Sequence, residues 1–219
     1  RIGRYADSMK ANIAAARADE QYLAIAGDDG LYRYGYYPHN VHFLLTSAQM
    51  VGNLHSVASE TERLKSILND DVAKQLPWVQ AIHAAPAFAL AQSGSPEAIL
   101  ALTKDSTDLA YVEAMRHYAR AVGQALAGDK AAFETEIAAL DTAGASAELA
   151  AMAEQGFPAP DIVKLASHVA RGRFALANGN PGAAVGEFEK AEAIEATIPY
   201  NEPPYWYYPV AQSRGAALY

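Results

Sequence analysis

The sequence predicts an all-α protein, a right-handed α-solenoid of about five helix hairpins. Apolar and small residues recur at helical spacing rather than in the alternation of strands. The chain has 219 residues, 51% of them hydrophobic, which indicates a packed protein. Glycines recur before Ala-rich helical stretches, where a helix pair needs a turn. These are Gly3, Gly52, Gly94, Gly128 and Gly179.

The residues at fixed distances from these glycines support the prediction of each helix. Five places later stand Ser8, Val57, Ile99, Phe133 and Ala184, and twelve places later Ala15, Leu64, Ser106, Leu140 and Ala191. Seven places earlier, where two helices must approach closely, stand Leu45, Ala87, Ala121 and Gly172. The first stretch, 1–18, is expected to be a second helix without its partner, and 210–219 a first helix without its partner. Turn residues place connections at 27–38, 69–77, 142–160 and 197–204.

The pattern resembles the tetratricopeptide repeat, a pair of helices with a glycine at the turn. Residues 162–194 match best, with Gly172, Gly179, Ala184, Phe188 and Ala191 on helix-packing positions, and Gly3, Tyr5 and Ala15 match at the start of the chain. The glycines are 49, 42, 34 and 51 residues apart, so one interval has the 34-residue length of the motif. The resemblance implies one solenoid domain over residues 1–219 that binds through a concave face lined by first helices. Because both ends lack helix partners, a longer parent chain is expected.

Composition excludes several classes of function. The formal net charge of −8 opposes nonspecific nucleic-acid binding, which needs a basic surface. No apolar stretch reaches the roughly 20 residues of a membrane-spanning helix. The absence of cysteine excludes thiolate metal sites and cysteine nucleophiles, but it fits a soluble protein of either the cytoplasm or the periplasm.

A polar stripe is predicted on the helix that begins at Pro38. His39 and His42 are three residues apart and therefore share a helix face, which Thr46 and Gln49 continue. This stripe is either a ligand or metal site on the concave face or an ordinary solvated helix surface.

A second cluster is the run from Tyr200 to Pro209, with five aromatic residues and three prolines that prevent an ordinary helix. It is either a binding wall in which Glu202 is a charged anchor or a rigid aromatic linker packed on the preceding repeat. Together with the Tyr-Tyr-Pro-His-Asn-Val-His-Phe run at 36–43, it resembles a set of bacterial tetratricopeptide-repeat proteins. That resemblance implies a shared surface and no activity.

Three further histidines each stand eleven residues before a turn glycine, at His83, His117 and His168. Equal register in successive first helices predicts a ladder of imidazoles. The alternative is that each is a core residue with its hydrogen bonds satisfied.

The leading interpretation is a non-catalytic binding or scaffold module for a peptide, a small ligand or a partner protein. The alternative is a copper- or zinc-binding protein, or a metal-dependent enzyme, with His39 and His42 as ligands. The sequence lacks the HExxH, GxSxG and phosphate-loop motifs, and His42 with Glu202 is the one acid–base pair that it offers. No residue is assigned as catalytic, and the expected ligand-binding residues are His39, His42, Gln49, His83, His117, His168, Glu202, Trp206, Tyr207, Tyr208 and Arg214.

Overall fold

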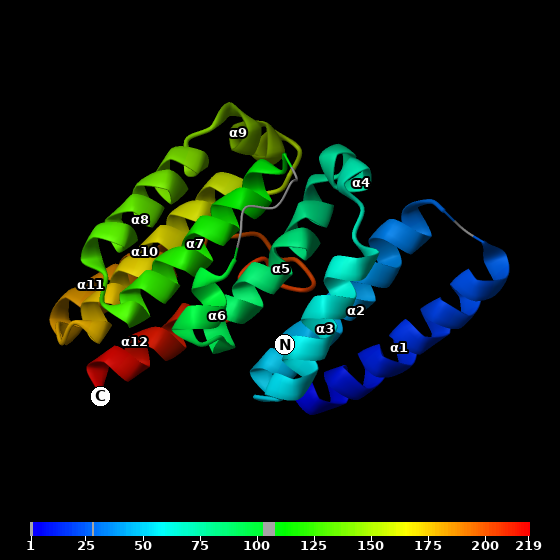
Figure 1. Cartoon of the computed structure of the whole chain (residues 1–219), viewed down its shortest axis with the longest axis horizontal. Coiled ribbons are helices and arrows are strands. Elements are labelled where there is room, and N and C mark those ends of the chain that lie inside the picture. The colour runs from blue at the N-terminus through cyan, green and yellow to red at the C-terminus, as the bar shows by residue number, and fades with distance from the viewer. Residues whose placement is uncertain (1, 28, 103–107) are drawn as a thin grey trace. The chain divides into compact units, whose positions relative to one another are not determined.

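The computed structural model describes residues 2–27, 29–102 and 108–219, and these ranges contain helices and no strand (Figure 1). The all-α prediction is therefore confirmed. The chain divides into two compact units, Arg1–Ser93 and Gly94–Tyr219, which are described separately. No helix in the described ranges combines the length and the apolar character that crossing a membrane requires.

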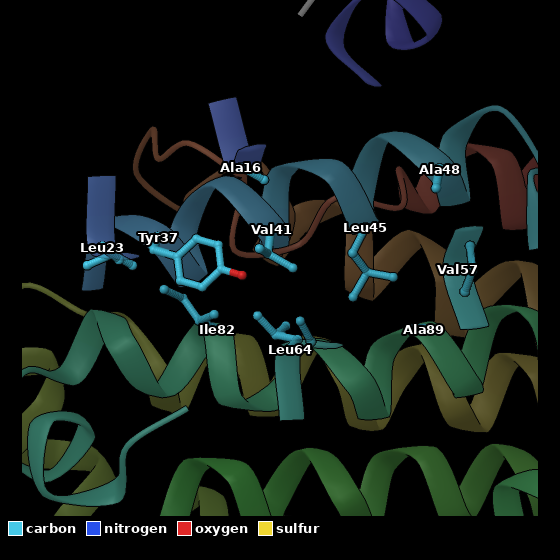
Figure 2. Close-up of a cluster of buried hydrophobic side chains, with 11 residues drawn as sticks. Ala16, Leu23, Tyr37, Val41, Leu45, Ala48, Val57, Leu64, Ile82 and Ala89 are labelled. Atoms are coloured by element: carbon cyan, nitrogen blue, oxygen red, sulfur yellow. The ribbon is translucent and has the colours of Figure 1, made fainter. Parts of the chain in front are cut away.

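The first unit is organised around α2, which packs against α1, α3 and α5. Figure 2 shows the core of this unit, where Val41, Leu45, Leu64 and Ile82 meet with almost no exposed surface. The helices are α1 (Tyr5–Ala26), the π-helix η1 (Tyr32–Tyr36), α2 (Tyr37–Met50), α3 (Leu54–Ile67), α4 (Asp70–Gln75) and α5 (Pro77–Ser93).

The second unit contains two helix hairpins, α7 with α8 and α10 with α11. Helix α10 also packs against α7 and α8, so the hairpins lie side by side (Figure 1), and α12 packs against α11 and α10. The helices are α6 (Pro96–Leu100), α7 (Ala110–Ala127), α8 (Lys130–Gly144), α9 (Ala147–Glu154), α10 (Ala159–Ala177), α11 (Pro181–Glu195) and α12 (Val210–Leu218).

The hairpin turns have a local chemical origin. Gly52, Gly128 and Gly179 have φ of 72°, 75° and 71°, the left-handed region in which a Cβ would be strained. The next residue in each case caps the second helix, because the side chains of Asn53, Asp129 and Asn180 accept a hydrogen bond from a backbone N–H of its first turn. Turn and cap together reverse the chain within a few residues.

Several boundaries differ from the sequence prediction. Helix α1 continues past residue 18 to Ala26, because no helix breaker precedes the left-handed Gly27. The helix expected to begin at Pro38 is preceded without a break by η1, so Pro38 lies in the first turn of α2. The predicted connections 69–77 and 142–160 contain the short helices α4 and α9, which Asn69 and Ser146 cap.

The helix that follows Gly94, expected as the second helix of a pair, is short. Helix α6 begins with Ser95 as its cap and ends at Leu100 after five residues. Residues 103–107, and with them Ser106 of the sequence alignment, lie outside the described residues.

Candidate functional site

The residues predicted to bind a ligand are distributed over both units. His39, His42, Gln49 and His83 belong to the first unit, and His117, His168, Glu202, Trp206, Tyr207, Tyr208 and Arg214 belong to the second.

The polar stripe of α2 is largely buried. His42 is only 5% exposed. Burial, together with the neighbouring His39, lowers the pKa of its imidazole to about 3. Thr46 donates its hydroxyl to the His42 carbonyl, and the Gln49 Nε2 donates to Gln92 Oε1 at 2.7 Å. His39 is half-buried, with its ring edge-on to Phe43. The His42 imidazole is therefore neutral at physiological pH.

The described residues offer few partners for a metal ion. His83 has a carboxylate beside it, because its Nδ1 lies 3.6 Å from Asp70 Oδ1. Among residues 2–27, 29–102 and 108–219, no three histidine or carboxylate side chains form a group that could hold an ion. The copper or zinc site at His39 and His42 stays a prediction.

An exposed aromatic group occupies the end of α1 and the π-helix. We call Tyr22, Tyr32 and Tyr36 the tyrosine surface. The ring centroids of Tyr22 and Tyr32 are 4.7 Å apart, and those of Tyr32 and Tyr36 are 6.1 Å apart. Tyr22 and Tyr36 are 48% and 56% exposed, so their rings face solvent.

A buried carboxylate fixes the middle ring of this surface. Asp19, only 5% exposed, accepts hydrogen bonds from the Tyr32 hydroxyl at 2.7 Å and from Asn40 Nδ2 at 2.8 Å. The hydrogen bond to Asp19, together with burial, raises the pKa of Tyr32. Because one carboxylate binds both the π-helix and α2, the position of the Tyr32 ring is set by the fold.

The neighbouring residue Tyr37 shows how an arginine binds a tyrosine in this unit. The Arg63 guanidinium lies 5.7 Å from the Tyr37 ring centroid and donates to Glu20 Oε1 at 2.6 Å. The Tyr37 hydroxyl donates to the same carboxylate oxygen at 2.9 Å. Although burial opposes the charged form, hydrogen bonds with Tyr37 and Glu60 raise the pKa of Arg63. The Tyr37 ring, the Arg63 guanidinium and the Glu20 carboxylate thus all contact one another.

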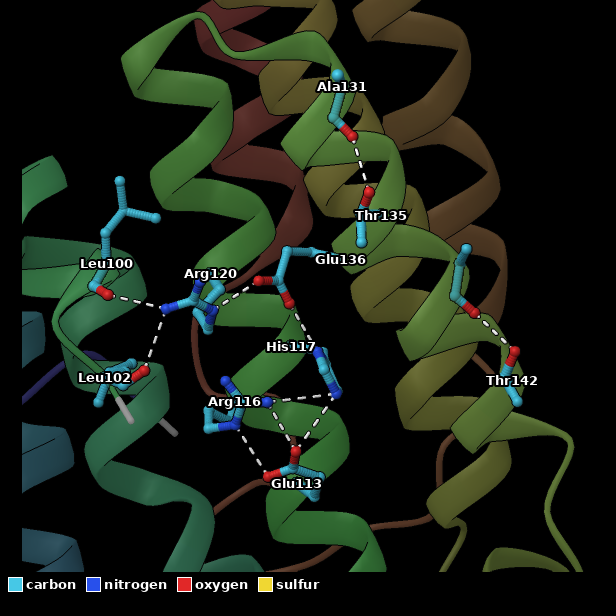
Figure 3. Close-up of polar contacts among 11 residues, drawn as sticks. Leu100, Leu102, Glu113, Arg116, His117, Arg120, Ala131, Thr135, Glu136 and Thr142 are labelled. Atoms are coloured by element: carbon cyan, nitrogen blue, oxygen red, sulfur yellow. Dashed lines mark hydrogen bonds and ion pairs between the residues drawn. The ribbon is translucent and has the colours of Figure 1, made fainter. Parts of the chain in front are cut away.

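In the second unit, His117 belongs to a network of charged side chains (Figure 3). Its Nδ1 lies 2.6 Å from Glu136 Oε2, and since a carboxylate only accepts, Nδ1 carries the proton. The other Glu136 oxygen accepts from Arg120 Nε at 2.6 Å, and Arg120 also donates to the carbonyls of Leu100 and Leu102. The network joins α7 to α8 and to the end of α6.

The same pair recurs in the next hairpin. His168 Nδ1 lies 2.8 Å from Glu187 Oε2, and this joins α10 to α11. Although burial opposes the shift, hydrogen bonds from Lys190 and His168 lower the pKa of Glu187. Both glutamates stand nineteen residues after their histidine, at the same distance from the turn glycine. These two histidines of the predicted ladder therefore each bind a carboxylate of their own hairpin.

The aromatic loop, residues 196–209, packs its rings on the helices of the second unit. Trp206 and Tyr207 are buried, with 6% and 7% exposed. The Trp206 ring meets the Tyr118 ring of α7 at 5.4 Å between centroids. This arrangement corresponds to the packed linker, one of the two interpretations of this run.

The remaining predicted residues lie on or after this loop. Glu202 accepts a hydrogen bond from the Tyr200 hydroxyl, and Tyr208 is half-buried. Arg214 donates from Nε to Glu192 at 3.1 Å, which joins α12 to α11.

Comparison of the chain with models of known families, with curated protein sequences and with solved structures finds no match. The tetratricopeptide-repeat family therefore remains a prediction.

Sequence reasoning missed the carboxylate partners, although a signal for two of them exists. Glu136 and Glu187 both stand eight residues after their turn glycine, and an alignment column at that distance contains them. Asp19, Tyr22 and Tyr32 carry no comparable signal, because their proximity depends on how α1 packs on α2.

Proposed function

We propose that this protein is a non-catalytic binding module that captures a basic segment of a partner protein on the tyrosine surface. The observation that carries the proposal is the exposure of Tyr22 and Tyr36 beside Tyr32, a ring held in place by a buried carboxylate. Exposed tyrosines with fixed geometry give large contact area at low entropic cost, which is typical of residues that dominate protein interfaces.

The charge of the molecule favours a basic partner. The formal net charge is −8, and Asp29 is an exposed carboxylate between α1 and the π-helix. An arginine side chain can lie on a tyrosine ring and pair with a carboxylate at the same time, as Arg63 does with Tyr37 and Glu20. An arginine of the partner would bind the ring face of Tyr22 or Tyr36 by a cation–π contact.

We further propose that the helices form a solenoid of tetratricopeptide type. Its support is the repetition of one hairpin chemistry, with a left-handed glycine, a capping residue and a histidine–glutamate pair at equal positions in α7–α8 and α10–α11. The packing of α10 on both helices of the preceding hairpin also agrees with stacked repeats.

The test uses a fluorescein-labelled dodecapeptide of arginine alternating with Gly and Ser, and the same peptide with glutamate in place of arginine. Fluorescence anisotropy measures the Kd of each for the full chain. We expect the arginine peptide alone to bind. Since a cation–π contact at an exposed site contributes about 0.5–1 kcal/mol, the double variant Tyr22→Ser/Tyr36→Ser should weaken binding by about tenfold.

Two control variants separate ring contacts from general charge attraction. Tyr22→Phe/Tyr36→Phe keeps both ring faces and should bind like the wild type. Tyr219→Ser removes an exposed tyrosine elsewhere and should also leave the Kd unchanged. Equal affinity of the wild type and the double serine variant would contradict the proposal.

A further inference from the structure

The aromatic loop begins and ends at one place. Helix α11 ends at Glu195, and the backbone N–H of Val210, the first residue of α12, donates to Glu195 Oε2 at 3.2 Å. Because α11 and α12 also pack against each other, the two ends of the loop are held together independently of the residues between them. The loop is therefore an Ω-loop, a compact excursion from a closed base.

The loop places two adjacent rings on a surface made by other elements. Tyr205 meets Phe157 edge-on at 4.9 Å, and Trp206 meets Tyr118 at 5.4 Å. Phe157, between α9 and α10, in turn lies edge-on to Tyr111 at 4.8 Å. We call Tyr111, Tyr118 and Phe157 the α7 aromatic surface. Its two tyrosines are two helical turns apart, about 10 Å along α7.

The two hairpins also make aromatic contacts of their own. The hairpins are held by Phe133 stacked on Phe174 at 4.3 Å and by Phe188, which is fully buried against Gly172. None of these side chains belongs to the loop. Removal of the loop would therefore leave these hairpin contacts in place and uncover the Tyr118 and Phe157 rings that Trp206 and Tyr205 contact.

The chemistry of the loop is that of a recognised peptide rather than of an ordinary turn. Its sequence from Pro199 to Pro209 places four aromatic residues, Tyr205 to Tyr208, between prolines. Prolines restrict the backbone of such a segment before binding, which reduces the entropy lost on binding, and aromatic-lined surfaces bind proline-rich segments.

We propose that the α7 aromatic surface is a binding site for a proline-flanked aromatic segment of a partner protein, and that the aromatic loop is the occupant that this chain itself supplies. The loop competes at a high effective concentration, on the order of millimolar for a short tether. The partner therefore binds only when the loop leaves. This site uses no residue of the tyrosine surface, so either proposal can fail without the other.

The experiment supplies the loop as a separate molecule. The probe is a fluorescein-labelled peptide with the sequence of residues 199–209. The loop-replaced variant carries a Gly-Ser linker of about six residues in place of residues 199–208, a length sufficient for a base that is already closed. We expect the loop-replaced variant to bind the peptide at least tenfold more tightly than the intact chain does.

Matched changes identify the surface. Tyr118→Ala in the loop-replaced variant, or alanine in place of the tryptophan of the peptide, should reduce binding by tenfold or more. Tyr219→Ala should not change it. Circular dichroism checks that each variant keeps its helices.

A second variant keeps the proposal testable if the loop-replaced chain does not fold. Trp206→Ala in the intact chain removes the ring that contacts Tyr118 and should increase binding of the peptide. If no folded variant binds the peptide more tightly than the intact chain, the loop is a structural cover and the proposal is wrong.

Discussion

His42 shows how burial of one side chain determines a response of the whole first unit to pH. Its pKa of about 3 in the folded chain lies below the ordinary value of 6.5. Between these values the unfolded chain binds a proton at His42 and the folded chain does not. The stabilisation is therefore complete above pH 6.5 and is lost as the pH falls toward 3.

We expect His42→Gln to remove this contribution. In the wild type, His42 makes the free energy of unfolding fall by up to about 1.4 kcal/mol per pH unit below pH 6.5. The variant keeps polar atoms and a similar volume, so its free energy should depend less on pH. Urea denaturation at pH 7, 6, 5 and 4 measures this in a Trp206→Phe background, where Trp78 is the remaining tryptophan and reports on the first unit.

His55 provides the control, because it is an exposed histidine in α3 of the same unit. His55→Gln should leave the pH dependence as it is in the wild type. An unchanged slope in His42→Gln would show that His42 does not remain neutral in the folded protein.

At the scale of elements, Gly172 marks where α10 and α11 approach each other, whereas Gly186 does not. A Cβ on Gly172 of α10 would lie 2.5 Å from the Phe188 ring, whereas a Cβ on Gly186 of α11 would meet nothing within 4 Å. Phe188 is fully buried and cannot move away. The packing therefore requires a glycine at position 172 but not at position 186.

We predict opposite effects of alanine at these two positions. Gly172→Ala should lower the free energy of unfolding of the second unit by about 1–3 kcal/mol through overpacking. Gly186→Ala should raise it by about 0.5–1 kcal/mol, because alanine is the better helix former. Urea denaturation followed through Trp206, in a Trp78→Phe background, measures both, and a stabilising Gly172→Ala would contradict the packing described.

The hairpins are the part of the structure that the sequence predicts best. Helical spacing and the turn glycines are local signals, and they place α2–α3, α7–α8 and α10–α11 correctly. The faces of these helices are less predictable, since His42 belongs to the predicted polar stripe but is only 5% exposed. The contact of Trp206 with Tyr118 could not be predicted from the run at 200–209, because the partner ring lies far upstream in the sequence.

For the whole molecule, the net charge of −8 determines which polymers can approach. A basic peptide is attracted, and a nucleic acid is repelled. We therefore expect the Kd for the arginine peptide to rise several-fold between 50 and 300 mM NaCl, because salt screens exposed charges. A labelled DNA duplex should not be retarded by the protein in a gel-shift assay at either salt concentration.

Two results would contradict this prediction. Retardation of DNA at 300 mM NaCl would show a local basic surface that overrides the net charge. A Kd that does not depend on salt would show that the peptide binds through apolar contacts alone.

The capped glycine turns have a consequence for the order in which the chain folds. Each turn brings together helices that are neighbours in sequence, and contacts between nearby residues form quickly because little loop entropy is lost. The contact of Trp206 with Tyr118 is different, because it requires both hairpins of the second unit to be in place. The hairpins should therefore form early, and the aromatic loop should close last, onto a scaffold that is already built.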